Sequence, residues 1–506
     1  MRKTHRVLAI PAFALDIEAM DLAFDNSFHD AMEGFYAPAE AAKPAAPKLL
    51  AFNHALANRL GIDGAGAGDE VIARLFSGQD LPGGANPLAL AYAGHQFGHF
   101  SPQLGDGRAL LLGEIVAPDG ARFDVQLKGS GPTPFSRNGD GKAAIGPVLR
   151  EFLVSEAMAA MGVPTTRALA AVATGDRVQR EQAHPGAVLT RIASSHIRVG
   201  TFQFFAAHFG ADHVVQLSDY SIRRHFPDLV EAPNPHLALL DRVIGLQCDL
   251  VAHWLGVGFI HGVMNTDNVA ISGETIDYGP CAFMDRFAAN TVFSSIDAHG
   301  RYAYGRQPQI MHWNMARFAE ALLPAIHSVD AADVETAKAL VAEVPGRFAA
   351  VWHGRLRRKL GLTEAQDGDG ALFDALFAEL ERHQVDFTLF FRGLAMMLRG
   401  DGSELEAQLP DADAMVPWIA DWWARLARET DAPLNRADAM DAVNPLYVPR
   451  NHLVEAALGA AEAGDLAAWF ELLEVVRNPY VRRPEWALFE GPAPAEFGPY
   501  KTFCGT

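Results

Sequence analysis

HGVMNTDNVAISGETIDYGP, residues 261–280, is the stretch of sequence that decides the fold class of this chain. Asp267 and Asn268 stand side by side before a Ser-Gly turn, and Asp277 follows that turn. Asp and Asn side chains in turns often only cap backbone groups. Three acidic or amide side chains grouped in this way instead favour a site for a hard cation such as Mg²⁺, which prefers oxygen ligands.

The same stretch has the order of groups found in the catalytic and metal-binding loops of protein kinases, H-R-D-L-x-x-x-N followed by D-F-G. Aligning His261 and Asn268 with that pattern places Val263 where a kinase has its catalytic base, and a valine cannot accept a proton. Asp277-Tyr-Gly stands where the metal-binding D-F-G belongs, and Asp267 lies directly before Asn268. The stretch therefore predicts a kinase-like scaffold that keeps its metal ligands and performs a different chemistry, or none.

A lysine and a glutamate further upstream fit the same scaffold. Residues 109–116 and 121–128 are predicted to form a hairpin that ends at Lys128, and Glu151 lies in the apolar stripe of a predicted helix, residues 147–161. An exposed lysine on a strand is usually only solvated. A kinase, however, pairs such a lysine with a helix glutamate to direct the ammonium group at nucleotide phosphates. We therefore expect a Lys128–Glu151 ion pair.

Two glycine-containing segments and two arginines are further candidates for nucleotide contacts. Residues 103–109, QLGDGRA, are an ordinary turn by themselves. Their glycines let backbone N–H groups approach phosphates, and Arg108 adds a cation close to the predicted lysine. Residues 139–142, GDGK, match a P-loop too poorly to be one, although a glycine-rich connection can still fold over a nucleotide. Arg191 and Arg198 are predicted to grip phosphates bidentately in an otherwise acidic chain.

Composition restricts the partners and the compartment. The chain has 506 residues, of which 49% are hydrophobic, and a formal charge of −19. This charge argues against nucleic acid or an anionic membrane as the main partner. Cys248, Cys281 and Cys504 are too few for a disulfide framework, so a reducing, cytoplasmic location is expected. No apolar run is long enough to span a bilayer.

The order of predicted elements indicates an α+β protein with the two-lobed plan of a protein kinase. The expected regions are a loose tail (1–20), an N-terminal extension packed on the core (21–87), a strand-rich lobe (88–205), a helical lobe with the catalytic and metal loops (206–330) and a C-terminal helical region (331–506). Further predicted elements are strands at 168–174 and 186–193, a helix at 237–255, and two short strands at 269–271 and 274–277.

His95 and His99 are four residues apart, a spacing that binds zinc when it lies on a helix. Gly94 and Gly98 argue against a helix, and no third ligand is evident in the sequence. We therefore expect a packing or hydrogen-bonding role for the two histidines.

Taken together, these motifs resemble the selenoprotein O family of kinase-like proteins. The match runs from about residue 22 to the end of the chain. The segments that carry it are YAGHQFG (92–98), QLGDGRA (103–109), QLKGSGPTPFSRNGDGKA (126–143), LREFLVSEAM (149–158), TRIASSHIRVGTFQ (190–203), HGVMNTDN (261–268), DYGP (277–280) and NPLYVPRNH (444–452). The resemblance implies transfer of AMP from ATP to Ser, Thr or Tyr hydroxyls of proteins, with release of pyrophosphate.

The resemblance also implies roles for individual residues. Lys128 would hold phosphate and pair with Glu151, and Asp267 would accept the hydroxyl proton. Asn268 and Asp277 would bind Mg²⁺, or Mn²⁺ in its place. The implied nucleotide contacts are Gly105, Gly107, Arg108, Lys128, Asp140, Gly141, Arg191, Arg198 and Asp277.

Three alternatives stay open: an unusual kinase that transfers the γ-phosphate, an inactive scaffold that binds ATP only to hold its shape, and a thiol redox protein that uses Cys504. The retained lysine, glutamate and metal ligands speak against a scaffold, and the lack of a C-x-x-C pair speaks against redox chemistry. Some members of the family link a tail thiol to a cysteine of the activation segment. Here Phe293 lies in the later part of that segment and only Cys281 is available, so a redox latch is not expected.

Overall fold

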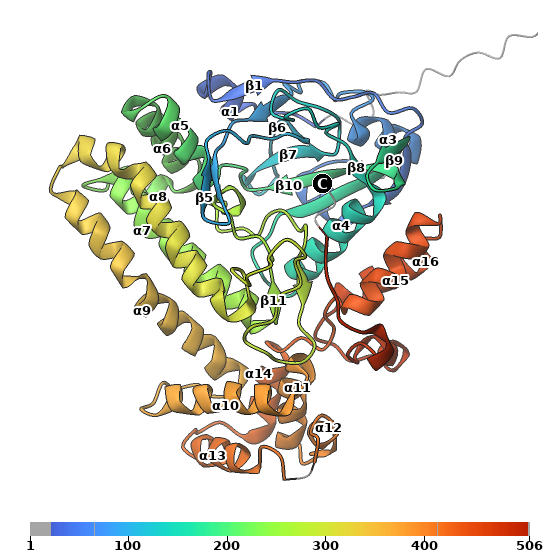
Figure 1. The fold of residues 1–506 in the computed structure, drawn as a ribbon, viewed down its shortest axis with the longest axis vertical. Coiled ribbons are helices and arrows are strands. Elements are labelled where there is room, and N and C mark those ends of the chain that lie inside the picture. Colours follow the sequence, from blue (N-terminus) through green and yellow to red (C-terminus); the bar gives the residue numbers. More distant parts are fainter. Residues whose placement is uncertain (1–21, 65, 412, 504–506) are drawn as a thin grey trace, which may run out of the picture.

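The computed structural model describes residues 22–64, 66–411 and 413–503. The expected loose tail and Cys504 lie outside these residues. Figure 1 shows a lobe built around a sheet at the top, long helices along one side and a group of short helices at the opposite end. The protein is therefore of mixed α and β structure, and the sheet and the helices are largely segregated.

An antiparallel sheet forms the centre of the first lobe. Its strands follow the order β1-β3-β6-β7-β10-β9-β2, and β8 pairs with β10. The strands are β1 (Tyr36–Pro38), β2 (Lys48–Phe52), β3 (Leu88–Leu90), β6 (Ala109–Val116), β7 (Arg122–Lys128), β8 (Ala143–Ala144), β9 (Arg167–Gln179) and β10 (Ala183–Ala193). The hairpin predicted at 109–116 and 121–128 is confirmed, and the two later strands are longer than predicted. Segments from before residue 88 supply both edge strands, β1 and β2.

Helix α4 (Ile145–Ala160) packs against β9 and β10 and confirms the helix predicted at 147–161. Leu149 and Phe152 are fully buried. They face α15 (Asn451–Glu462) and α16 (Ala467–Val476), where the indole of Trp469 donates a hydrogen bond to the Leu149 carbonyl at 3.2 Å. Helix α4 is thus held between the sheet and a C-terminal helix pair, which fixes the position of Glu151.

Except for three short N-terminal helices that pack on the sheet, the remaining helices form the second lobe and the region below it in Figure 1. Helix α7 (Pro235–Gly256) confirms the predicted helix at 237–255, and the side chain of Asn234 caps it by accepting the Leu237 amide at 3.2 Å. The others are α1 (Ser27–Ala31), α2 (His54–Leu60), α3 (Asp69–Ser77), α5 (Val199–His208), α6 (Ala211–His225), α8 (Gln307–Val329), α9 (Asp333–Lys359), α10 (Asp369–His383), α11 (Phe387–Leu398), α12 (Ser403–Glu406), α13 (Val416–Leu426) and α14 (Pro433–Asp441). None of the helices in the described part of the chain has both the length and the apolar character needed to cross a bilayer.

The two short strands predicted at 269–271 and 274–277 do not form, and that prediction is wrong. Ala270 makes an isolated bridge with Arg198, and Thr275 makes one with Thr165. The backbone of this stretch therefore bonds to two distant segments instead of to itself. The strand pair in this part of the lobe is β11 (Phe259–Ile260) with β12 (Ala282–Phe283), which brackets the stretch.

A separate hairpin of β4 (Gly94–Gln96) and β5 (His99–Ser101) reaches from the sheet lobe to the helical lobe. Phe97 and Gly98 form its turn with φ angles of 52° and 87°, as a two-residue turn with twist-matched strands requires. The His95 amide donates to Thr266 Oγ1 at 2.7 Å, which fixes the hairpin to the loop that carries Asp267. The two histidines lie on paired strands rather than on a helix, which agrees with the expected absence of a helix.

Candidate functional site

A cavity of about 280 Å³ lies between the sheet and the loops of the helical lobe. Its lining contains almost every residue that the sequence marks as functional. These are Gly105, Gly107, Arg108, Lys128, Asp140, Gly141, Arg191, Arg198, Asp267, Asn268 and Asp277. Glu151 lies behind this wall, where it contacts the side chains that face the cavity.

The predicted ion pair between Lys128 and Glu151 is present, with 2.6 Å between Nζ and Oε2. Lys128 ends β7 and Glu151 lies on α4, so the pair joins the sheet to its covering helix. Arg191 on β10 also contacts Glu151, through Nε at 2.8 Å. Burial alone would raise the pKa of Glu151, but Arg191 and Lys128 hold it below its usual value. The carboxylate is therefore ionised and orients two cations towards the cavity.

Asp277 completes this cluster from the other lobe. It adopts a left-handed backbone conformation, with φ of 69°, which a non-glycine residue rarely takes and which is common at functional sites. Its carboxylate contacts the Lys128 ammonium group and lies 3.5 Å from the Arg191 guanidinium. Burial opposes ionisation, but Lys128, Arg108 and Arg191 hold the pKa of Asp277 well below its usual value. This aspartate is a permanent anion at the floor of the cavity.

Asn268 ends the short 3₁₀ turn Thr266–Asn268 and faces the same cavity. Its side-chain nitrogen donates to the Val263 carbonyl at 3.0 Å, which leaves the amide oxygen for another partner. In the described residues no group of three or more His, Cys, Asp or Glu side chains is arranged to hold a metal ion. A divalent ion here would therefore have Asn268 and Asp277 as its protein ligands, with phosphate and water oxygens completing the shell. Such a donor set suits Mg²⁺, which retains waters and bridges phosphates.

Asp267, next to Asn268, has the opposite environment to Asp277. Its Oδ1 atom is buried and has no hydrogen-bond partner. Burial raises its pKa to about 6, since neither Arg198 nor the turn backbone compensates for the lost hydration. Glycines at positions 94 and 200 make room for it, because a Cβ at Gly94 would overlap Asp267 Oδ1 and one at Gly200 would overlap the Ala93 carbonyl. A carboxylate with this pKa can take up a proton near neutral pH.

The two glycine-containing segments predicted to contact a nucleotide both contribute to the lining of the cavity, through residues 105–109 and 139–142. Gly105 and Gly141 have φ of 74° and 63°, and a side chain would collide with Phe135 at the first position and with the Gly131 carbonyl at the second. Thr133 Oγ1 donates to the Asp106 carbonyl at 2.6 Å and ties the first segment to the connection that leads to the second. Asp140 is paired with Arg180 at 2.9 Å, and this hydrogen bond lowers the pKa of Asp140. The Asp140 carboxylate thus helps to hold the wall together.

The two arginines predicted to bind phosphates use many of their N–H donors in hydrogen bonds to protein groups. Besides its bonds to Glu151, Arg191 donates to Gln126 Oε1 at 3.1 Å. Arg198 donates to the Asp267 carbonyl at 2.8 Å, and its guanidinium carbon lies 4.4 Å from the centre of the Tyr92 ring. Both therefore offer positive charge to a ligand rather than an open fork of donors. Arg108, by contrast, has no carboxylate partner within the described residues.

Asp106 was not recognised from the sequence as a functional residue, although it lies within the QLGDGRA motif. It is 1% exposed, accepts from Gln126 Nε2 at 3.1 Å and from the Leu90 amide at 3.3 Å, and lies 3.4 Å from Arg198. Tyr92, Arg180 and Lys142 also line the cavity without having been predicted to bind the nucleotide. An aspartate between two glycines is a recognisable motif in the sequence. Nothing in the sequence, however, indicated that the Asp106 side chain points into the protein.

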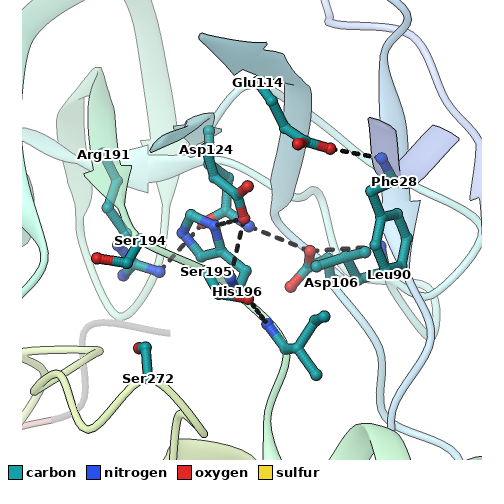
Figure 2. Close-up of polar contacts among 12 residues, drawn as sticks. Phe28, Leu90, Asp106, Glu114, Asp124, Arg191, Ser194, Ser195, His196 and Ser272 are labelled. Carbon is teal, nitrogen blue, oxygen red and sulfur yellow. Dashed lines mark hydrogen bonds and ion pairs between the residues drawn. The ribbon is translucent and has the colours of Figure 1, made fainter. Parts of the chain in front are cut away.

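Behind the cavity, a second set of buried carboxylates ties the strands to the connection between the lobes (Figure 2). Asp124 on β7 accepts from the His196 amide at 2.9 Å and from Arg224 at 2.6 Å. Glu114 on β6 accepts from the Phe28 amide at 2.5 Å. Arg224 forms ion pairs with both Glu114 and Asp124, so neither buried carboxylate is left without a charged partner.

The two cysteine thiols in the described residues are unsuited to redox chemistry. Burial raises the pKa of Cys281 to about 12 and that of Cys248 to about 11, so both are unreactive thiols near neutral pH. Phe293 is bonded to the C-terminal segment through the backbone, with the Thr502 amide donating to its carbonyl at 2.8 Å. Thr502 thus lies beside Phe293, and position 293 offers no thiol.

Comparison with known proteins agrees with this geometry. Residues 18–477 match the family model described as "Protein adenylyltransferase SelO". A protein of Sphingopyxis alaskensis named "Protein nucleotidyltransferase YdiU" is 78% identical over 487 residues, which cover 96% of this chain and all of that protein. Proteins of the same name from Cereibacter sphaeroides and Rhizobium etli are 53% and 51% identical, each over 96% of this chain and over 100% and 97% of their own lengths. The chain therefore belongs to the SelO family of protein adenylyltransferases, which makes it a nucleotidyltransferase.

Proposed function

We propose that the protein transfers AMP from ATP to Ser, Thr or Tyr hydroxyls of other proteins in a Mg²⁺-dependent reaction on a two-lobed, kinase-like fold. One observation carries the proposal. A buried aspartate with an unpartnered oxygen, Asp267, lines the same cavity as Asn268 and Asp277, the two proposed metal ligands, whereas the kinase base position holds Val263. Family membership supports the adenylyl chemistry, and the geometry supports the individual roles.

The fold proposal rests on the relation between the lobes. A lysine at the end of a sheet strand pairs with a glutamate on the helix that covers the sheet, as in protein kinases. The loop with Asn268 and the turn with Asp277 face this pair from the helical lobe across the cavity. This is the arrangement that places a nucleotide between two lobes with its phosphates near the lysine.

In the proposed reaction, the substrate hydroxyl oxygen attacks the α-phosphorus and the bond from that phosphorus to the β-phosphate oxygen breaks. The hydroxyl proton moves to Asp267, whose pKa near 6 lets it act as a base in neutral solution. Pyrophosphate leaves with heavy negative charge. Lys128, Arg108 and Arg191 lie where they would neutralise that charge, and such fixed cations act mainly on the transition state.

The cation fits the residues present, since Asn268 has a free amide oxygen and Asp277 stays ionised. When bound, it supplies charge neutralisation for the phosphates. Lys128 contacts Asp277 directly in the structure, so the proposed phosphate-binding lysine and the proposed metal ligand lie next to each other.

The alternatives make different predictions. A kinase would transfer the γ-phosphate, and an inactive scaffold would bind ATP without transferring either group. A redox protein that used Cys504 would keep its activity when the metal ligands were removed. The buried, unreactive Cys281 offers that thiol no ready partner within the described residues.

The deciding experiment uses purified protein, Mg²⁺, cell lysate as a source of substrates, and ATP labelled on either the α- or the γ-phosphate. We expect label to enter protein only from the α-position and to be lost in Asp277→Ala. Incorporation from the γ-position alone would support a kinase. ATP binding without incorporation of either label would favour the scaffold.

A further inference from the structure

A surface groove lies on the helical lobe. It has a volume of about 770 Å³ and is lined by residues of the activation segment, the start of α8 and the β4–β5 hairpin. We refer to it as the 296–310 groove. A neighbouring hollow of about 480 Å³ continues along residues 290–303 to Lys501. Together they form an extended surface on the described part of the chain that the nucleotide chemistry does not use.

The 296–310 groove is positive although the chain as a whole is strongly acidic. Arg301 and Arg306 line it, and Lys501 lines its continuation. None of these three cations has a carboxylate within ion-pair distance in the described residues, whereas most of the buried arginines of this protein do. The one carboxylate that lines either hollow is Asp297. It is buried and accepts from the Arg301 and Tyr302 amides at 2.8 Å each. The cations are therefore available to a partner.

Arg301 is held in place without being neutralised. Its guanidinium carbon lies 5.0 Å from the centre of the Trp313 ring and 5.7 Å from that of Tyr302. Its buried Nε atom has no hydrogen-bond partner. Aromatic rings orient an arginine while leaving its charge intact. The groove also offers apolar contacts, since Ile296 is 50% exposed and Phe97 forms part of the wall.

The groove is linked directly to the turn that carries Asp267. Asn265 Oδ1 accepts from the Phe97 amide at 3.1 Å and from the Tyr302 hydroxyl at 2.6 Å. Phe97 itself adopts a left-handed conformation that is unusual for an aromatic residue. Two walls of the groove thus meet at a buried side chain two positions before the proposed base. A segment lying in the groove would have its neighbouring hydroxyl close to Asp267.

From this arrangement we infer that the 296–310 groove binds the protein substrate, and that it selects acceptor hydroxyls with Asp or Glu nearby in the same segment. This inference rests on the proposed function, because it names the substrate class of the same reaction. Arg301 and Arg306 are specificity-determining residues, each forming a partly exposed ion pair with the substrate.

Three pools of synthetic peptides test the inference. Each peptide has one Ser, Thr or Tyr, flanked by Glu in the first pool, by Gln in the second and by Lys in the third. Partly exposed ion pairs contribute modestly, so we expect kcat/KM for AMP transfer to be roughly 3- to 10-fold higher for the acidic pool than for the neutral pool, and lowest for the basic pool. The same pools are then given to the double variant Arg301→Glu, Arg306→Glu and to the control Arg428→Glu, which changes an exposed arginine in the turn that follows α13.

The double variant is expected to reverse the order of the pools and to gain activity on the basic peptides, a result that misfolding cannot produce. The control should keep the order of the wild-type protein. Equal labelling of the three pools, or a preference for acidic peptides that survives the double substitution, would overturn the inference while leaving AMP transfer intact. Failure of the wild-type protein to label any pool or any lysate protein from α-labelled ATP would instead overturn the proposed function, and this inference with it.

Discussion

Two aspartates ten positions apart face the same cavity from neighbouring turns, yet their surroundings drive their acidities in opposite directions. Asp277 has Lys128, Arg108 and Arg191 around it, and its pKa lies well below the usual value. Asp267 is buried with an unpartnered oxygen, and its pKa rises to about 6. Two carboxylates whose pKa values are shifted apart commonly have different roles in one active site. This difference supports the proposed roles, in which Asp277 binds the cation and Asp267 takes up the proton.

Removing each carboxylate in turn gives the most direct test of this division. Loss of a general base commonly costs about 10²- to 10⁴-fold, so Asp267→Asn should lower kcat by that order while leaving the KM for ATP nearly unchanged. Asp277→Asn should also weaken the dependence on Mg²⁺, because it removes a proposed ligand. Initial rates over a matrix of ATP and Mg²⁺ concentrations would measure both effects. Identical kinetic defects in the two variants would show that the roles are not divided.

Crowding Asp267 should separate its position from its charge. Gly94→Ala places a methyl group against Asp267 Oδ1, and displacing a catalytic group by about 1 Å can cost on the order of 10²-fold in rate. We expect a large loss in kcat with ATP binding preserved, as judged by a fluorescent ATP analogue. Gly346→Ala is the matched control, since its added methyl meets nothing within 4 Å and lies inside helix α9. A fully active Gly94→Ala protein would contradict the close packing around the base.

The pH profile should report the pKa of the base. A general base acts when deprotonated, so kcat/KM should fall about tenfold per pH unit below pH 6 and level off above it. Burial also raises the pKa of Glu274 to about 7, but this residue bonds to Ser194 and Ser272 outside the cavity. Glu274→Gln should therefore leave the inflection near pH 6 in place. If the inflection shifts in Glu274→Gln, it reports the titration of Glu274 and not that of Asp267.

The smallest expected effect is on stability, and its sign is opposite to that of the effect on activity, because a substitution that impairs catalysis should stabilise the fold. The pKa of Asp267 is raised in the folded protein, so its ionised form costs stability as the pH rises from about 4 through 6. Asp267→Asn should therefore stabilise the protein above pH 6, by roughly 1–3 kcal/mol, and should have little effect at pH 4. Thermal unfolding without ATP and metal would measure this. In contrast, Glu151→Gln should destabilise the protein at neutral pH, because it leaves two buried cations with a weaker partner.

The pairing of Lys128 with Glu151 could be predicted from sequence because each residue lies on a regular element with a clear hydrophobic period. The strand ends at Lys128 and the helix stripe contains Glu151, and the pairing of two such residues in protein kinases indicated that they meet. The lining of the cavity was also largely predictable, because the loop motifs carry unusual glycines and charges.

The parts that could not be predicted depend on contacts between distant segments. Residues 269–271 have a strand-like composition, yet their backbone bonds to residues 197–199. The inward direction of Asp106 depends on Gln126 and Leu90, and no local pattern encodes it. The burial of Asp267, which determines its pKa, likewise comes from glycines far away in the chain, at positions 94 and 200.

The two edge strands of the sheet have a consequence for how the chain folds. Strand β2 pairs with β9 and strand β1 pairs with β3, so one short N-terminal stretch closes the sheet at both ends. Strands so far apart in sequence pair slowly, because closing the long intervening loop costs conformational entropy before the contacts between the strands form. Until residues 36–52 dock, the central strands present two open hydrogen-bonding edges, which are templates for aggregation. The N-terminal segment thus covers both edges of a sheet that forms slowly. We expect its removal to reduce the solubility of the protein before it reduces the catalytic rate.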